Sequence, residues 1–182
     1  MPRRRFLRML LCIAAGITAA TALAQREAPE ASVKAAFLYK FANYIEWPAN
    51  AFAAPAAPLV IGVAGSDEVA TELERIAPGR NVNGHPVAVK RLREGESPRG
   101  THLLFIGREN AALAPMLRAA RDNAVLAITE SERGLEMGSA INFVTAGDRV
   151  AFEVSLEAAE KTGHRISSRM LAVARRVVPK TS

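Results

Sequence analysis

The fold class of this chain is decided by the stretch LVIGVAGSD, which occupies residues 59–67. Its first six residues are apolar or glycine and do not alternate with polar ones, as is typical of a β-strand covered on both faces. Glycine, serine and aspartate then interrupt the run, and Val69, Leu73 and Ile76 fall on one face of a helix predicted over residues 68–77. A buried strand that leads directly into an amphipathic helix is the building unit of an α/β sheet.

Further strands and one helix are predicted in the middle of the chain. Asn83-Gly84 is typical of a two-residue hairpin turn, and apolar runs without alternation predict buried strands. A helix is predicted before the apolar run of residues 124–129. It either starts near Asn110 with a kink at Pro115 or begins at Pro115, because proline is tolerated at the start of a helix. The predicted strands are Val82 with residues 86–92, residues 102–106 and residues 124–129.

The pattern changes to period two near the C-terminus, which predicts an antiparallel hairpin with one buried face. Its turn lies around residues 146–148, and its inward residues are Ile141, Phe143, Val150, Phe152 and Val154. The elements together predict an α/β fold. We expect a mixed, largely parallel sheet flanked by helices, with a C-terminal antiparallel hairpin, in a Rossmann-like sandwich.

Two helices are predicted after the hairpin. Ser155 is the predicted N-cap of a short helix that runs through Lys161, and Gly163 ends it. A last helix is predicted over residues 168–177, because its apolar residues fall on one face. These residues are Met170, Val173, Ala174 and Val177.

A helix is also predicted before the first strand, over residues 32–47. Ser32 is its predicted N-cap and Pro48 its predicted stop. An uncharged connector rich in alanine and proline, residues 49–58, joins this helix to the first strand. The apolar residues of the helix fall on one stripe, and they are Val33, Phe37, Phe41, Tyr44 and Ile45.

Residues 1–24 have the three parts of a secretory signal peptide. Four arginines, at positions 3, 4, 5 and 8, precede an apolar run, and Ala22-Leu23-Ala24 supplies the small residues that a signal peptidase requires. Because the run is shorter than the roughly 20 residues of a membrane span, an uncleaved anchor is the weaker interpretation. We expect cleavage after Ala24, a disordered lead over residues 25–31, one domain over residues 32–182, and no membrane insertion of the mature chain.

Cleavage would change the two features of the whole chain that suggest nucleic-acid binding and thiol chemistry. The chain has a formal charge of +6, a pI near 10.1 and one cysteine, Cys12. Residues 1–24 contain four arginines and no acid, so their removal leaves 158 residues with a charge of +2 and no cysteine. The mature protein would have no disulfide, no thiolate metal ligand and no cysteine nucleophile, and we expect no nucleic-acid partner.

No enzymatic or cofactor-binding motif is complete in the sequence. Gly62 and Gly65 follow a strand, but their spacing differs from the dinucleotide-binding fingerprint, and no phosphate-binding lysine follows. His85, His102 and His164 are scattered along the chain without the spacing of metal ligands, and a serine-nucleophile elbow is missing. We therefore expect no catalytic residue, no metal and no cofactor.

An aromatic segment at the end of the first predicted helix is one candidate for binding. Tyr44, Glu46 and Trp47 lie there, and Trp47 is the only tryptophan of the chain. Aromatic side chains at such a place form either a hydrophobic plug, which is the stronger interpretation, or an anchor for a partner protein.

A basic segment at the start of the last predicted helix is the other candidate. Ser167 is either an N-cap flanked by exposed arginines or part of a site for an anionic or polar ligand. The helix cap is the stronger interpretation, because nearly every helix start offers free N–H groups. The candidate residues are Arg165, Ser167, Ser168 and Arg169.

Several of these segments, in the same order along the chain, resemble the YfiR family of periplasmic proteins. The similarity begins with KAAFLYKFANYIEWP, residues 34–48, and extends over nearly the whole mature chain. The ordered set carries the resemblance, rather than any single segment. The other similar segments are VNGHPV (82–87), HLLFIG (102–107), INF (141–143), RVAFEV (149–154) and RISS (165–168). Asn142, within INF, is added to the candidate binding residues.

The resemblance implies a periplasmic inhibitor that docks on the periplasmic sensor region of a membrane-anchored diguanylate cyclase. Such an inhibitor would lower cyclic di-GMP and restrain biofilm formation. The resemblance also implies an α/β sandwich and is compatible with a homodimer. Better-known members carry disulfides linked to redox control, whereas the mature chain predicted here has no cysteine. Thiol oxidation within this protein is therefore not the signal that releases a cyclase.

Two functions of different classes stay open. The first is a non-enzymatic regulator that acts through an apolar surface patch formed by the aromatic helix end and the last helix. It would bind the inactive conformation of the sensor more tightly than the active one. The second is a periplasmic sensor module that binds a small ligand at residues 165–168. An exported hydrolase is disfavoured, because no nucleophile or metal set can be assembled.

Overall fold

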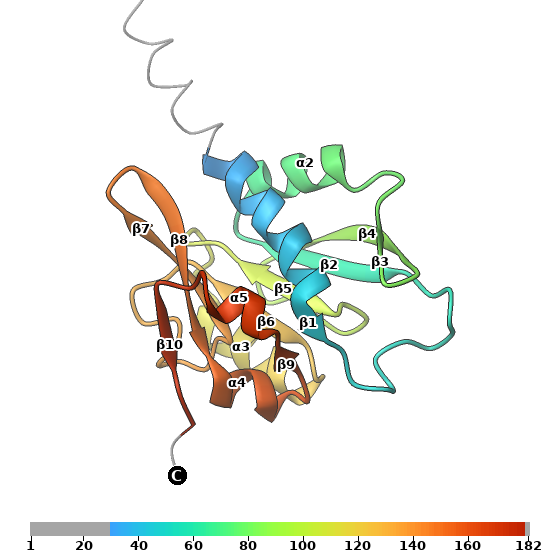
Figure 1. The fold of residues 1–182 in the computed structure, drawn as a ribbon. Helices are drawn as coiled ribbons and strands as arrows, with labels where there is room; N and C mark the ends of the chain where they lie inside the picture. Colours follow the sequence, from blue (N-terminus) through green and yellow to red (C-terminus); the bar gives the residue numbers. More distant parts are fainter. Residues whose placement is uncertain (1–29, 181–182) are drawn as a thin grey trace, which may run out of the picture.

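The computed structural model describes residues 30–180, which form an eight-stranded sheet and a separate two-stranded sheet (Figure 1). Five neighbouring strands of the large sheet are parallel: β4 (His85–Leu92), β2 (Leu59–Ala64), β5 (Leu103–Ile106), β6 (Leu126–Thr129) and β7 (Ile141–Ala146). β3 (Asn81–Val82) pairs antiparallel with β4 at one edge. At the other edge, β8 (Arg149–Ser155) pairs antiparallel with β7, and β10 (Arg176–Val178) pairs parallel with β8. The α/β class, the mixed and largely parallel sheet, and the C-terminal hairpin are confirmed.

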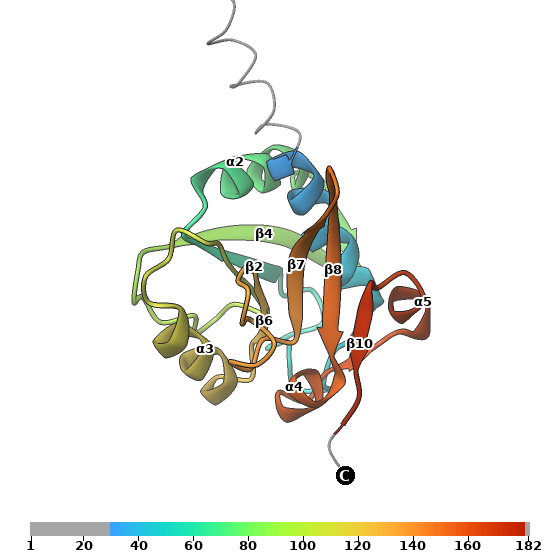
Figure 2. The ribbon, with the colours of Figure 1, turned by 90° about the vertical axis from the view of Figure 1, so that its left-hand side faces the viewer.

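Helices cover both faces of the strongly curved sheet (Figure 2). The first described helix, residues 30–44, and α2 (Asp67–Ile76) pack on one face, while α3 (Leu113–Asp122) packs on the other. α4 (Leu156–Lys161) follows β8 directly and contacts β10. The two-stranded sheet pairs β1 (Ile45–Glu46) with β9 (Arg165–Ile166), and α5 (Ser168–Leu171) follows β9.

Alternate side chains of the central strand β5 enter two separate cores. Leu103 and Phe105 pack in the larger core with helix 30–44 and α2, whereas Leu104 and Ile106 pack in the smaller core with α3. All four side chains are buried. A strand that is buried on both faces consists of a continuous apolar run, which explains why the sequence predicted β2 and β5 correctly.

The chemistry of one tight turn explains the hairpin between β3 and β4. Asn83 and Gly84 both have positive φ, 52° and 93°, as the common two-residue hairpin turn requires. The N–H of Gly84 donates to Asn81 Oδ1 at 2.7 Å. Asparagine and glycine enter this backbone region more readily than other residues, so the predicted hairpin is confirmed.

Within the described residues, the first helix begins before the predicted Ser32 and ends three residues before the predicted Trp47. It spans residues 30–44, so residues 30 and 31 belong to the helix and not to a lead segment. Ser32 is not the N-cap, because its hydroxyl donates to Glu72 Oε2 at 2.8 Å and connects the helix to α2. Residues 45 and 46 leave the helix because they pair with β9. The predicted signal peptide, residues 1–24, lies outside the described residues.

The buried face of helix 30–44 also differs from the predicted stripe. Val33 and Tyr44 were expected inside, but they are 41% and 40% exposed. Small side chains define the real face, because they let the helix approach the sheet closely, and the prediction counted only large apolar residues. The buried residues of the helix are Ala31, Lys34, Ala35, Leu38, Phe41 and Ala42.

The last predicted helix is wrong over most of its length. α5 ends at Leu171, and the chain then forms β10, which pairs with Glu153–Ser155 of β8. Val173, which was expected to face the core, is 71% exposed. Two consecutive β-branched residues, Val177 and Val178, favour a strand. The pairing with β8 then stabilises the strand, because hydrogen bonds between the two strands replace those that a helix would form.

The start of α3 differs from both predicted starts. The helix begins at Leu113, after a turn in which the N–H of Ala112 donates to Asn110 Oδ1 at 2.9 Å. Pro115 is the third residue of the helix. It does not kink the helix, because the N–H groups of the first turn have no partner within the helix anyway.

Candidate functional site

The structure brings the two candidate segments of the sequence together. β1 and β9 pair antiparallel, so that Glu46 lies opposite Arg165 and Ile45 opposite Ile166. One further bond, from Ser167 N–H to the carbonyl oxygen of Tyr44 at 2.9 Å, extends the contact to the start of α5. Ile45 is buried and anchors the pair to the core, while Glu46 and Arg165 are exposed. This pairing could not be predicted from the sequence, because each strand has only two residues.

A groove of about 390 Å³ lies beside this small sheet. It collects four of the predicted binding residues, Tyr44, Glu46, Trp47 and Ser167. The remaining predicted residues of the basic segment, Arg165, Ser168 and Arg169, are exposed and do not line it. The other lining residues are Asn43, Ile45, Phe52, Asn83 and His85.

Trp47 is held firmly beneath the groove. Its indole N–H donates to the carbonyl oxygen of Ala42 at 3.2 Å, and its ring lies 6.2 Å from Phe52, 6.1 Å from His102 and 5.2 Å from His164, measured between ring centroids. The side chain is half-buried. Trp47 therefore packs as a plug on the core and also contributes to the wall of the groove.

The three histidines that are far apart in the sequence lie around Trp47 and Phe52. The ring of Phe52 stacks on His85 at 3.5 Å and on His102 at 4.6 Å. Sequence reasoning missed this histidine cluster, defined as His85, His102 and His164. One signal was present: His85 opens β4, and His102 and His164 directly precede β5 and β9. β4 and β5 lie parallel on the two sides of β2, so their amino ends are at the same end of the sheet, which brings His85 and His102 together.

Hydrogen bonds define the protonation of two of these rings. His102 Nδ1 accepts the N–H of Val60 at 3.0 Å, so its Nε2 carries the proton and donates to the carbonyl oxygen of Ala51 at 3.0 Å. The Thr162 hydroxyl donates to Ala159 O, so its oxygen accepts from His164 Nδ1 at 2.9 Å. The ring of His102 is therefore neutral in this arrangement, and Nδ1 of His164 carries a proton.

Burial keeps these rings neutral at physiological pH. Desolvation lowers the pKa of His164 to about 4, and His102 contributes as a nearby like charge. Desolvation also lowers the pKa of His102, with a smaller contribution from His85. Among residues 30–180, no group of three His, Cys, Asp or Glu side chains has an arrangement that could hold a metal ion.

Ser167 is the N-cap of α5, as the stronger interpretation of the basic segment predicted. Its Oγ accepts the N–H of Arg169 at 3.3 Å. α5 has only four residues, so it lacks the dipole of a long helix. The anion-site interpretation of residues 165–169 gains no support from this geometry.

Asn142 lies away from the groove and is buried, with 2% of its surface exposed. Its Oδ1 accepts the hydroxyl of Thr129 at 2.7 Å and the N–H of Ser131 at 3.1 Å. A Cβ on Gly134 would collide with both Thr129 Oγ1 and Asn142 Oδ1. Asn142 therefore fixes the loop after β6, and the structure assigns it a structural contact.

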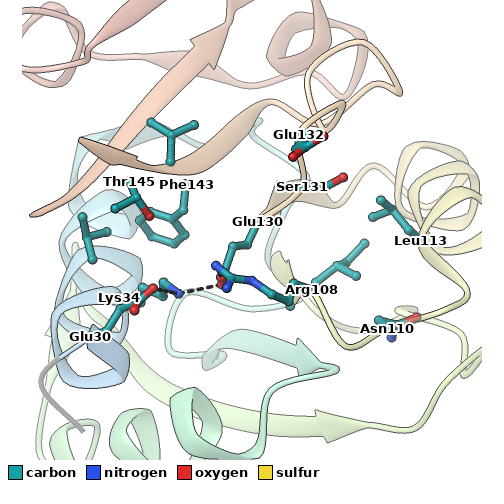
Figure 3. Close-up of a pocket in the computed structure, with 14 residues that line it drawn as sticks. Glu30, Lys34, Arg108, Asn110, Leu113, Glu130, Ser131, Glu132, Phe143 and Thr145 are labelled. Carbon is teal, nitrogen blue, oxygen red and sulfur yellow. Dashed lines mark ion pairs between the residues drawn. The ribbon is translucent and has the colours of Figure 1, made fainter. Parts of the chain in front are cut away.

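A larger cavity, of about 650 Å³, lies at the carboxyl ends of the parallel strands, where β5 and β6 end (Figure 3). Residues from the start of helix 30–44 and from the hairpin of β7 and β8 complete its wall. Ligands of open α/β sheets commonly bind at the carboxyl ends of the strands. The polar lining residues are Glu30, Lys34, Arg108, Asn110, Glu130, Ser131, Glu132 and Thr145.

Four of the five charged side chains in this cavity, all except Glu132, form ion pairs with one another. Lys34, which is buried, bridges Glu30 Oε1 at 2.6 Å and Glu130 Oε2 at 2.7 Å, and Arg108 pairs with the other oxygen of Glu130 (Figure 3). The hydrogen bond from Lys34 lowers the pKa of Glu30. An anionic ligand would have to displace a carboxylate from these cations, so the network acts first as a clamp between helix 30–44 and the sheet.

Comparison of the sequence with models of protein families shows the family to which this chain belongs. The model of the YfiR/HmsC-like family matches residues 31–175, which include helix 30–44 except its first residue, the whole large sheet except β10, and the groove. The chain belongs to the YfiR/HmsC-like family. The resemblance found in the sequence is thereby confirmed. The YfiR/HmsC-like family consists of periplasmic, regulatory and non-catalytic proteins, and membership supports a general role in the regulation of diguanylate cyclase signalling.

One solved structure shares the fold of this YfiR/HmsC-like chain. It is the crystal structure of a conserved domain protein from Vibrio cholerae O1 biovar El Tor strain N16961, with a TM-score of 0.51 and 14% sequence identity. The match covers 65% of this chain and 54% of the other, so the chain spans about half the length of that protein. No curated protein shows significant sequence similarity.

Within residues 30–180, no helix has the length and apolar character needed to cross a membrane.

Proposed function

We propose that this protein binds the periplasmic sensor region of an inner-membrane diguanylate cyclase and represses the enzyme, without catalysis of its own. Repression would lower cyclic di-GMP and restrain biofilm formation. The family supports regulation of this signalling system, and the juxtaposition of β1 with β9 supports the place of contact. We name the exposed side chains there, Tyr44, Glu46, Arg165, Ser168 and Arg169, the β1–β9 surface.

The composition of the β1–β9 surface fits a contact between proteins. Tyr44 is 40% exposed although it is aromatic, and arginine and tyrosine are the residues that most often contribute binding energy at interfaces. Among residues 30–180, no ion pair engages Glu46, Arg165 or Arg169, whereas many other charged side chains are paired. These charges are available to a partner, and complementary charges on that partner would speed the encounter and set its specificity.

Repression follows if the protein prefers one conformation of the sensor. A regulator shifts a two-state equilibrium only by the difference in its affinity for the two states. A preference of about a hundredfold for the inactive state, or about 2.7 kcal/mol, would move an evenly populated sensor to about 1% active. The β1–β9 surface supplies contacts for such a preference without any reaction at the site.

Crosslinking in cells tests this function. A photo-reactive phenylalanine analogue replaces Tyr44 in one variant and Met137 in a control, since Met137 is exposed to nearly the same degree, 38%, in a loop on another part of the chain. We expect the analogue at position 44, but not at 137, to crosslink to an inner-membrane protein with a diguanylate cyclase domain. Deletion of the gene should raise cellular cyclic di-GMP. Equal crosslinking from both positions, or unchanged cyclic di-GMP, would contradict the proposal.

A small-ligand sensor is the second candidate function. The cavity where β5 and β6 end offers more room for a ligand than residues 165–168, so we place the ligand of such a sensor in that cavity. A thermal-shift screen with nucleotides, amino acids and carboxylates distinguishes the two functions, because a ligand that binds the native state raises the melting temperature. Saturable stabilisation that Glu132→Gln removes and Ser167→Ala does not would support a sensor. A homodimer stays a prediction that light scattering can test.

A further inference from the structure

Two of the three histidines, His85 and His102, hold one loop, the connector of residues 49–58, whereas His164 packs on Trp47 just before it. His85 Nδ1 donates to the carbonyl oxygen of Ala57 at 2.7 Å, and His102 Nε2 donates to that of Ala51 at 3.0 Å. Phe52, in the same loop, lies against both rings, with its plane inclined by 11° to His85 and by 20° to His102. Imidazole groups therefore hold the connector near both of its ends.

His102 can keep its position beside β2 only as a neutral ring. Its Nδ1 accepts the N–H of Val60, the second residue of β2, and a protonated imidazole has two donors and no acceptor. Protonation leaves the Nε2 donor to Ala51 in place, but it turns the bond from Val60 into an opposition of two N–H groups, so that the ring would have to move and disturb its contacts with the connector. His85 differs, because its one bond to Ala57 uses a donor that protonation leaves in place.

The surroundings offer little to stabilise a positive charge. The connector contains no charged residue, and the charged groups that act on the rings are other histidines, His102 on His164 and His85 on His102. β1 and β9 contribute Glu46 and Arg165 at the exposed rim. The charged residues of α4, which packs against β9, are engaged elsewhere: Glu157 with Lys161 and Glu160 with Lys180.

We infer that the histidine cluster is an acid-sensitive switch that releases the connector from the groove and thereby changes the binding surface. Phe52 and His85 line the groove together with Tyr44, Glu46 and Ser167 of the proposed interface. The biological meaning of the switch rests on the proposed function, since release of the connector would alter affinity for the cyclase sensor. It supplies a signal that needs no cysteine, in a chain whose predicted mature form has none. Burial, which lowers the pKa of His102 and His164, confines the response to acidic conditions.

Backbone NMR of the purified mature chain between pH 7.5 and 4.5 tests the switch without any partner. The chain has three histidines, so three imidazole signals report the cluster completely. We expect the amide signals of residues 51–60 to change in step with the His102 ring. The hydrogen-exchange protection of the Val60 amide should fall about tenfold, as expected when one hydrogen bond is lost.

Two matched variants separate the switch from general acid sensitivity. In His102→Asn, the side chain keeps an acceptor for Val60 but cannot be protonated, so the connector amides should no longer respond to acid. In His85→Asn, a donor to Ala57 remains, so the response should persist and move to higher pH, since a like charge next to His102 is gone.

Three results would overturn the inference. The connector amides stay unchanged while His102 titrates, they respond equally in His102→Asn, or His102 stays neutral until circular dichroism reports global unfolding. Because the experiment uses the chain alone, its failure leaves the proposed repression of a cyclase intact. Failure to bind a cyclase, in turn, leaves the acid response of the connector intact.

Discussion

The indole ring of Trp47 lies 5.2 Å from the imidazole ring of His164, and the two ring planes are perpendicular. Trp47 reaches this position at the end of helix 30–44, and His164 reaches it at the start of β9, so the contact joins the two segments that the sequence marked as candidates. Protonated histidine quenches indole fluorescence by contact. Since Trp47 is the only tryptophan, we expect acid to quench the fluorescence of wild-type protein more strongly than that of His164→Asn, in which only the more distant His102 ring, at 6.1 Å, remains beside the indole. Quenching of equal size in both proteins would contradict this geometry.

The stability of the fold should decrease in acid because of His164. Its pKa is about 4 in the folded chain against 6.5 for the unperturbed group, so the unfolded state binds the proton first as the pH falls. The contribution of His164 is complete above pH 6.5, and about 3 kcal/mol is lost between pH 6.5 and 4. Urea unfolding at a series of pH values measures this, and His164→Asn should show a flatter dependence. The same slope in both proteins would assign the acid sensitivity to other groups.

Lys34 should be essential for stability although it is charged. Lys34→Met would leave the carboxylate of Glu30 without its cation and Glu130 with Arg108 alone, at a cost of about 3 kcal/mol in the free energy of unfolding. Lys40→Met, on the exposed side of the same helix, should change it by less than about 0.5 kcal/mol. Equal effects in chemical denaturation would show that the buried charge network is not a clamp.

The strands that could be predicted well from the sequence are those that are buried on both faces along their whole length. β2 and β5 are buried on both faces, so a continuous apolar run identifies them without knowledge of their partners. β10 and the pair of β1 and β9 are different, because their state depends on hydrogen bonds to segments far away in the chain. The histidine cluster was missed for the same reason: only the order of strands in the sheet brings His85 and His102 to one edge.

Asn142 should behave as a structural residue. In Asn142→Ala, the hydroxyl of Thr129 and the N–H of Ser131 lose their shared acceptor, and we expect a loss of about 2 kcal/mol in stability. Asn142→Asp keeps an acceptor oxygen and should lose less. Thermal or urea unfolding distinguishes the two variants. Reduced binding of a cyclase sensor with unchanged stability would instead return Asn142 to the binding residues.

The central claim is that the β1–β9 surface binds the periplasmic region of a diguanylate cyclase, and the affinity of purified chains for that region tests it most directly. Isothermal titration calorimetry would compare wild type, Tyr44→Asp and Met137→Asp, which place the same charge at similarly exposed positions. We predict that Tyr44→Asp weakens binding at least about tenfold, as expected for a central aromatic contact, and that Met137→Asp binds like wild type. Wild-type affinity in folded Tyr44→Asp, or equal losses in both variants, would contradict the account.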